Sequence, residues 1–160
     1  MTALRPPRGG APVGFLKELD PVEAAAVRCL RCWGADTEAE TRLCAEFAGA
    51  LGPEQGGRVT ETLSDICSLC ALHGRRPLMR HAETCPCLGA DECCFATFIA
   101  AASSGDREDA MLFAAMLVRA DLAPALAGLA ERLGLALRRM ALRRADETTP
   151  RETDKTGRLH

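Results

Sequence analysis

The 160-residue sequence has no tyrosine, and its aromatic residues are limited to five phenylalanines and one tryptophan. Residues with a branched β-carbon are also few, and no segment alternates apolar and polar residues over a useful length. Aromatic and β-branched residues in alternating patterns are the usual signature of strands. The composition therefore argues against a fold built on sheets, and we expect no strand.

The chain also lacks a strong net charge and a long hydrophobic run. Its formal charge of -2 gives no general attraction to nucleic acid or to anionic lipid. The longest uncharged stretches, 93–105 and 110–118, are shorter than the roughly 18 residues that span a bilayer. The amino terminus has no apolar run of the kind that a secretory signal needs. We therefore expect a cytoplasmic protein without a membrane span, and the preference for Arg over Lys is typical of a GC-rich bacterial genome.

The helical signals divide the chain into one domain with two tails. Residues 1–14 and 145–160 are rich in Pro, Gly, Thr and charge, which predicts disordered tails. Between them, 15–144 carries apolar residues at three- and four-residue spacing. Capping residues or prolines predict helix starts near Asp20, Asp36, Pro53, Asp91, Asp106 and Asp121. The predicted fold is an all-α compact bundle of five to six helices, with a long Cys/His-containing loop between helices 3 and 4.

Nine cysteines are the most unusual feature of the sequence, and six of them lie between Ile66 and Cys94 with two of the three histidines. In a reducing compartment, clustered cysteines are more often metal ligands or redox groups than disulfides. The odd number of cysteines also argues against a fully paired disulfide framework. We therefore expect a metal site in this window.

The expected ligands come from two neighbouring segments. They are Cys67, Cys70 and His73 at the end of the third helix, and His81, Cys85 and Cys87 in the loop after it. On a helix, residues three apart project from adjacent turns and can hold two corners of a tetrahedron. A bend at Pro86 would let the two loop thiols supply two further corners. Four of the six candidates would bind, and the sequence leaves their choice open.

Thiolate ligands indicate Zn2+, and a full set of four protein ligands leaves no position for a substrate, so we expect a structural site. The ion would fasten a loop that has few large apolar groups to hold it. One alternative is an iron–sulfur cluster on the same cysteines, although the ferredoxin spacings are missing. Another is a redox or metal sensor, in which oxidation releases the metal from Cys67, Cys70, Cys85 and Cys87.

The remaining cysteines have simpler interpretations. Cys29 and Cys32 stand at a helix end beside Trp33, which favours small buried thiols over a second metal site or a thioredoxin-like motif. Cys94 lies four residues before Phe98 on the inward face of its helix and is expected in the core. The role of Cys93 stays open.

No catalytic motif is present: a nucleophile elbow, a phosphate-binding glycine loop and a helical HExxH are all missing. A binding protein is therefore preferred to an enzyme, and the alternative of a site assembled from scattered residues such as His73, Glu83 and Asp91 stays open without a motif to support it. Arg75, Arg76 and Arg80 flank the predicted metal loop and could contact phosphate or an acidic partner. No aromatic residues stand among them for base stacking, so a protein partner is preferred to nucleic acid. The predicted function is that of a small zinc-binding helical protein, regulatory in role, which acts by binding another macromolecule. Its oligomeric state is not predicted.

Overall fold

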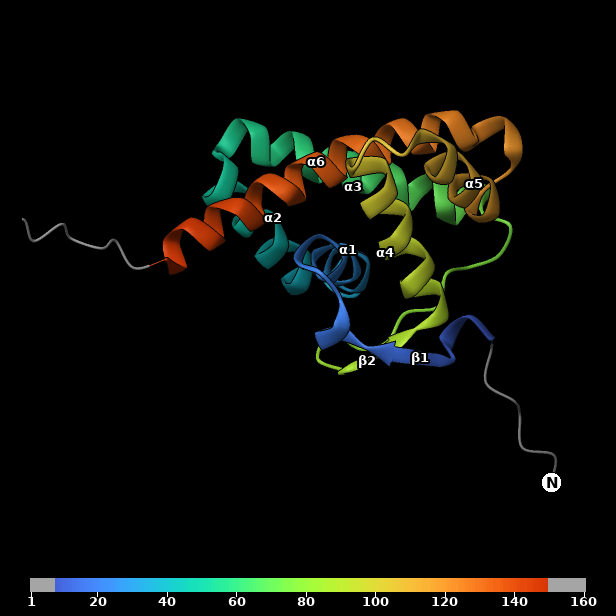
Figure 1. Cartoon of the computed structure of the whole chain (residues 1–160), viewed down its shortest axis with the longest axis horizontal. Coiled ribbons are helices and arrows are strands. Elements are labelled where there is room, and N and C mark those ends of the chain that lie inside the picture. The colour runs from blue at the N-terminus through green and yellow to red at the C-terminus, as the bar shows by residue number, and fades with distance from the viewer. Residues whose placement is uncertain (1–7, 150–160) are drawn as a thin grey trace, which may run out of the picture.

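Residues 8–149 are described by the computed structural model, and they form six α-helices around a large apolar core (Figure 1). The predicted all-α class is confirmed, as is the Cys-containing loop between the third and fourth helices. Helices α1 to α3 are Pro21–Cys32, Thr37–Leu51 and Pro53–His73, and helices α4 to α6 are Ala90–Ser103, Arg107–Leu117 and Ala123–Thr148. The shorter elements are strands β1 (Pro12–Phe15) and β2 (Cys87–Gly89) and the 3-10 helices η1 (Arg8–Gly10), η2 (Leu16–Glu18) and η3 (Ala120–Leu122).

The long helix α6 is the element against which most other helices pack. It contacts α1, which is seen nearly end-on in Figure 1, and it also contacts α3, α4 and α5. Helix α2 packs along α3. The largest fully buried apolar side chains come from α2, α3, α4 and α6: Phe47, Leu63, Ile66, Phe95, Phe98, Ile99, Leu126 and Leu133. Helix faces with three- and four-residue apolar spacing therefore supply the core, as the sequence predicts.

The first helices begin and end at local signals. The Asp20 carboxylate accepts a hydrogen bond from the Glu23 N–H at 2.9 Å, and the Glu23 carboxylate accepts one from the Asp20 N–H, which completes a capping box at the start of α1. Gly34 and Gly52 follow α1 and α2 with φ angles of 76° and 89°. Only glycine enters this left-handed region without a steric penalty, so both helices stop there.

The start of α4 differs from the prediction, which placed Asp91 at the N-cap. Gly89 is the N-cap, and the Glu92 carboxylate accepts a hydrogen bond from the Gly89 N–H at 2.9 Å. Asp91 lies inside the first turn and is only 3% exposed. Glu92 is 0% exposed, so the first turn of α4 has two adjacent buried carboxylates, those of Asp91 and Glu92.

The amino-terminal segment has regular structure where the sequence predicts a tail. Residues 1–7 lie outside the described part of the chain, but 8–14 form η1 and most of β1. β1 pairs antiparallel with β2, with Phe15 opposite Cys87, at the lower edge of the molecule in Figure 1. The expectations of a tail at 8–14 and of no strand were wrong, because this pairing joins segments far apart in the chain and local periodicity does not reveal it.

The carboxyl-terminal prediction is also corrected. Helix α6 continues through Thr148, where the predicted tail would have begun at 145. Residues 150–160 lie outside the described part of the chain. The polar composition of 145–148 is compatible with helix because these residues extend α6 as an exposed end and need no apolar face.

Helices α2 and α3 pack closely because Gly56 has no side chain at their contact. A Cβ at this position would lie 2.6 Å from the backbone nitrogen of Ala48. We expect Gly56→Ala to lower the free energy of unfolding by about 1–3 kcal/mol through overpacking. The next residue supplies the control, because Gly57 has open space around it and Gly57→Ala should stabilise the helix by up to about 1 kcal/mol. Urea unfolding of both variants measures the difference, and equal effects would contradict the close approach.

Candidate functional site

The loop at 74–86 is fastened at its start to the end of α5. The Arg75 N–H donates to the Leu117 carbonyl at 3.1 Å, and the Arg119 N–H donates to the His73 carbonyl at 3.4 Å. Gly74 and Val118 form an isolated antiparallel bridge between these two bonds. The end of α3 and the end of α5 are thus tied by backbone hydrogen bonds.

The middle of the loop is held by Asp91. The Arg76 guanidinium forms a two-bond ion pair with the Asp91 carboxylate, with Nη1 donating to Oδ2 at 2.7 Å. The Met79 N–H donates to the same Oδ2 atom at 2.8 Å. Because charged groups are rarely buried unless they are paired, the burial of Asp91 is explained by these three donors.

The end of the loop is held by a buried ion pair between Arg31 of α1 and Glu92 of α4. Arg31 Nε donates to Glu92 Oε1 at 2.8 Å and Nη2 donates to Oε2 at 2.9 Å, and the two side chains are 1% and 0% exposed. Arg31 also donates to the carbonyls of Cys85 and Cys87, at 2.7 and 2.6 Å. Glu92 accepts from the backbone N–H of His81 at 2.8 Å.

Sequence analysis missed Arg31 and Glu92 as functional residues. A signal for Arg31 is present, because it lies four residues after Val27 on the face of α1 that is otherwise buried. A charged residue at an inward position of an amphipathic helix indicates a buried partner. The partner itself is not visible locally, since Glu92 lies 61 residues later in the chain.

Arg31 and Glu92 bind the backbone of Cys85 and His81, whose side chains contact each other. The Cys85 Sγ atom lies 3.5 Å from His81 Nδ1. The other ring nitrogen, Nε2, lies 2.9 Å from the Gly10 carbonyl of η1, and a carbonyl only accepts hydrogen bonds, so Nε2 carries a proton. In the neutral ring, Nδ1 is then the acceptor that faces the thiol.

This arrangement favours the charged forms of both groups. The backbone N–H of Cys87, followed by His81, lowers the pKa of the Cys85 thiol below its ordinary value. Hydrogen bonding to Cys85, followed by the Gly10 carbonyl, raises the pKa of His81. A thiolate stabilised by a neighbouring imidazolium is the reactive form of cysteine. Cys85 is also partly exposed, so solutes reach it.

Of the other predicted ligands, Cys87 is the first residue of β2 and lies beside Cys85. Cys67 and Cys70 are on α3, and His73 is the last residue of that helix. Within the described residues 8–149, no three His, Cys, Asp or Glu side chains lie close enough together to hold a metal ion. The arrangement thus brings His81 and Cys85 together but gives no four-ligand site, and zinc stays a prediction from the sequence.

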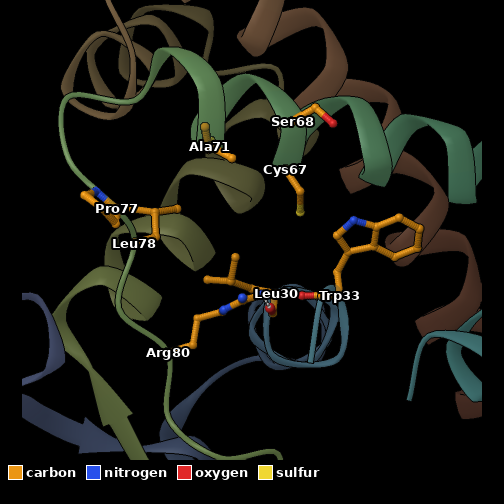
Figure 2. A pocket seen from close by; sticks show the side chains of 10 residues that line it. Leu30, Trp33, Cys67, Ser68, Ala71, Pro77, Leu78 and Arg80 are labelled. Atoms are coloured by element: carbon orange, nitrogen blue, oxygen red, sulfur yellow. Dashed lines mark hydrogen bonds between the residues drawn. The ribbon is translucent and has the colours of Figure 1, made fainter. Parts of the chain in front are cut away.

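Cys67 and Cys70 line a cavity of about 420 Å³ between α1, α3 and the loop. Figure 2 shows the Cys67 thiol directed into this cavity, with Trp33 on one side and Leu78 on the other. Burial raises the pKa of Cys67 to about 12 and that of Cys70 to about 11. These two thiols therefore stay protonated and unreactive at neutral pH.

The cysteines of α1 are buried, as the sequence predicts. Cys29 and Cys32 are 2% and 1% exposed. Burial raises the pKa of both thiols, which removes their thiolate form at neutral pH. Cys94 is half-buried and packs against the core, and burial raises its pKa as well.

The arginines beside the loop are engaged within the chain. Arg75 Nε donates to the Ala115 carbonyl at 2.7 Å, and Arg76 is paired with Asp91 as described above. Arg80 Nη1 donates to the Leu30 carbonyl at 2.8 Å, near the carboxyl end of α1. The positive charge of Arg80 thus compensates the helix dipole at the carboxyl end of α1. Because Arg75, Arg76 and Arg80 all have partners within the chain, binding of phosphate or nucleic acid by these arginines is less favoured.

In the described residues, no helix has the length and apolar character needed to cross a membrane. Comparisons with protein-family models, with curated proteins and with solved structures gave no match. The contact between Cys85 and His81 is therefore the feature of this chain that best indicates a function.

Proposed function

We propose that this protein is a thiol-based redox regulator of the cytoplasm, in which Cys85 is the reactive group. The single observation that carries the proposal is the 3.5 Å contact between Cys85 Sγ and the Nδ1 atom of a histidine whose other nitrogen is held by Gly10. A cysteine paired with an oriented histidine is the arrangement that activates thiols in cysteine-dependent proteins generally.

The proposed reaction is oxidation by a peroxide. The Cys85 thiolate attacks one peroxide oxygen, so an S–O bond forms, the O–O bond breaks, and sulfur loses two electrons to the peroxide. His81 supplies the proton that the departing hydroxide or alkoxide needs. The Cys87 thiol then attacks the Cys85 sulfur, which forms a disulfide and releases water. A cytoplasmic thiol system reverses the change by thiol–disulfide exchange.

Cys87 is proposed as the second thiol because only Pro86 separates it from Cys85 in the chain. Its side chain is also one of the groups that lower the Cys85 pKa. Cys67 and Cys70, which the sequence grouped with these two in a sensor, line the cavity beside Trp33 and have raised pKa values. The proposal therefore limits the sensor to the loop cysteines.

The regulatory part of the proposal is binding to another protein. Leu112 and Met116 lie one helical turn apart on α5 and are 65% and 64% exposed. Exposed apolar residues on one helix face are typical of protein contact surfaces. The engagement of Arg76 and Arg80 within the chain supports a protein partner over nucleic acid.

Peroxide treatment of the reduced protein tests the proposal. We expect a Cys85–Cys87 disulfide as the first product, identified by peptide mass spectrometry and reversed by dithiothreitol. Cys85→Ser should abolish it, while Cys44→Ser on α2 should leave it unchanged, because Cys44 is outside the loop. Oxidation that begins at other cysteines, or no faster at Cys85 than at Cys44, would contradict the proposal.

Elemental analysis of the protein purified without added metal separates the proposal from the zinc prediction. About one zinc per chain, with Cys85 protected from alkylation until a chelator is added, would contradict the redox proposal and support the predicted metal site. Reactive Cys85 without chelation supports the redox proposal. Iron with visible absorbance would instead favour the iron–sulfur alternative.

A further inference from the structure

The Arg31–Glu92 ion pair binds the backbone of the loop and of β2 as well as joining its own two side chains. Two hydrogen bonds join its members, and four more go to backbone groups of the segment that contains the reactive thiol. The four backbone partners are the carbonyls of Cys85 and Cys87 and the N–H groups of His81 and Gly89.

These four partners lie within and on either side of the segment Cys85–Pro86–Cys87. His81 precedes this segment and provides the imidazole, while Gly89 follows it at the end of β2. The Pro86 carbonyl accepts from the Leu16 N–H at 2.9 Å. Every residue of the segment is thus bonded through its own carbonyl, to Arg31 of α1 or to Leu16 of η2, and Glu92 of α4 holds the residues on either side.

A buried ion pair is an unfavourable choice if stability alone is at issue, because two charges must leave water. Apolar residues of similar volume often serve a core as well or better. A guanidinium, however, presents donors in a fixed planar fork, and a carboxylate presents acceptors on two oxygens. This pair can therefore orient several backbone groups at once, which an apolar pair cannot do.

We propose that Arg31 and Glu92 are positioning residues that hold the Cys85 thiol against His81 and Cys87. Neither residue touches a reacting atom in this assignment. They act through the backbone of residues 81–89, and the inference rests on the proposed redox function of Cys85.

The test compares the alkylation rate of Cys85 with that of Cys44 in the same molecule, at neutral pH, in Arg31→Lys and Glu92→Gln. Lys keeps the charge of Arg31 but has no fork, and Gln keeps the shape of Glu92 but has no charge. We expect the ratio of Cys85 to Cys44 rates to fall at least fivefold in each variant. Leu126→Ala, a fully buried core substitution in α6, controls for loss of stability and should leave the ratio unchanged.

The comparison is made where circular dichroism shows all variants folded. Loss of stability in both polar variants with an unchanged ratio would overturn the positioning role and leave a purely structural one. A wild-type ratio near one would instead overturn the redox proposal itself. If neither polar variant folds, amide hydrogen exchange of the wild type decides: protection of the His81 and Gly89 N–H groups as strong as inside α4 supports the inference, and exchange typical of an open loop overturns it.

Discussion

Glu92→Ala is expected to destabilise the fold by about 3–5 kcal/mol, because it leaves the Arg31 cation buried without a partner. A guanidinium does not lose its proton in proteins, so this charge has no route to neutrality. The N–H groups of His81 and Gly89 lose their acceptor at the same time. Urea unfolding monitored by circular dichroism gives the free energy directly.

The matched control is an exposed ion pair. Glu54 and Arg58 form an i,i+4 pair on α3 whose side chains are 84% and 72% exposed. Glu54→Ala should change stability by less than about 0.5 kcal/mol, since exposed pairs of this kind contribute little. Similar losses in the two variants would mean that the Arg31–Glu92 pair is not buried in solution as it is in the structure.

The same pair makes the stability depend on pH in a defined direction. Burial raises the pKa of Glu92, but hydrogen bonds from Arg31, Gly89 and His81 outweigh it and hold the pKa below its ordinary value. A depressed folded pKa means that this contribution is present above the unfolded pKa of about 4.3 and is lost as the pH falls through the folded pKa. In Glu92→Gln this acid-dependent part of the stability should be missing.

The helices were predictable because their signals are local. The capping box of Asp20 and Glu23, the stop at Gly34 and the apolar faces that carry Phe47 and Phe98 all lie within a few residues of the features they determine. The burial of Cys29 beside Trp33 followed from the same local patterns. Elements whose partners are distant were missed, as β1 shows, since it pairs with a strand that follows α3.

The candidate site was predictable only in part. His81 and Cys85 were recognised as a pair of donors four residues apart, and the structure brings them into contact. Their assignment to a zinc site relied on the clustering of thiols and imidazoles, and zinc stays a prediction. The supporting argument that the loop has little else to hold it was wrong, because Asp91 and Glu92 of α4 bind the loop from inside the fold.

His81→Gln should lower the alkylation rate of Cys85 about tenfold at neutral pH. The Gln amide can replace Nε2 as a donor to the Gly10 carbonyl, but it supplies no second nitrogen to face Cys85. Since His81 is one of the groups that lower the Cys85 pKa, its removal raises that pKa and reduces the thiolate fraction at pH 7. The rate should therefore recover as the pH rises, and the wild-type and variant rates should converge once both thiols are ionised.

His73→Gln is the control for this change, because His73 ends α3 and its backbone contact is with Arg119. Its pH–rate profile at Cys85 should follow that of the wild type. A pH–rate profile of His81→Gln with an unchanged midpoint and an alkylation rate lowered by the same factor at every pH would indicate lost access to the thiol. That result would contradict a role of His81 in activating Cys85. A midpoint displaced to higher pH, with an unchanged rate at high pH, is the result that an imidazole stabilising the thiolate requires, because only the ionisation of Cys85 is then altered.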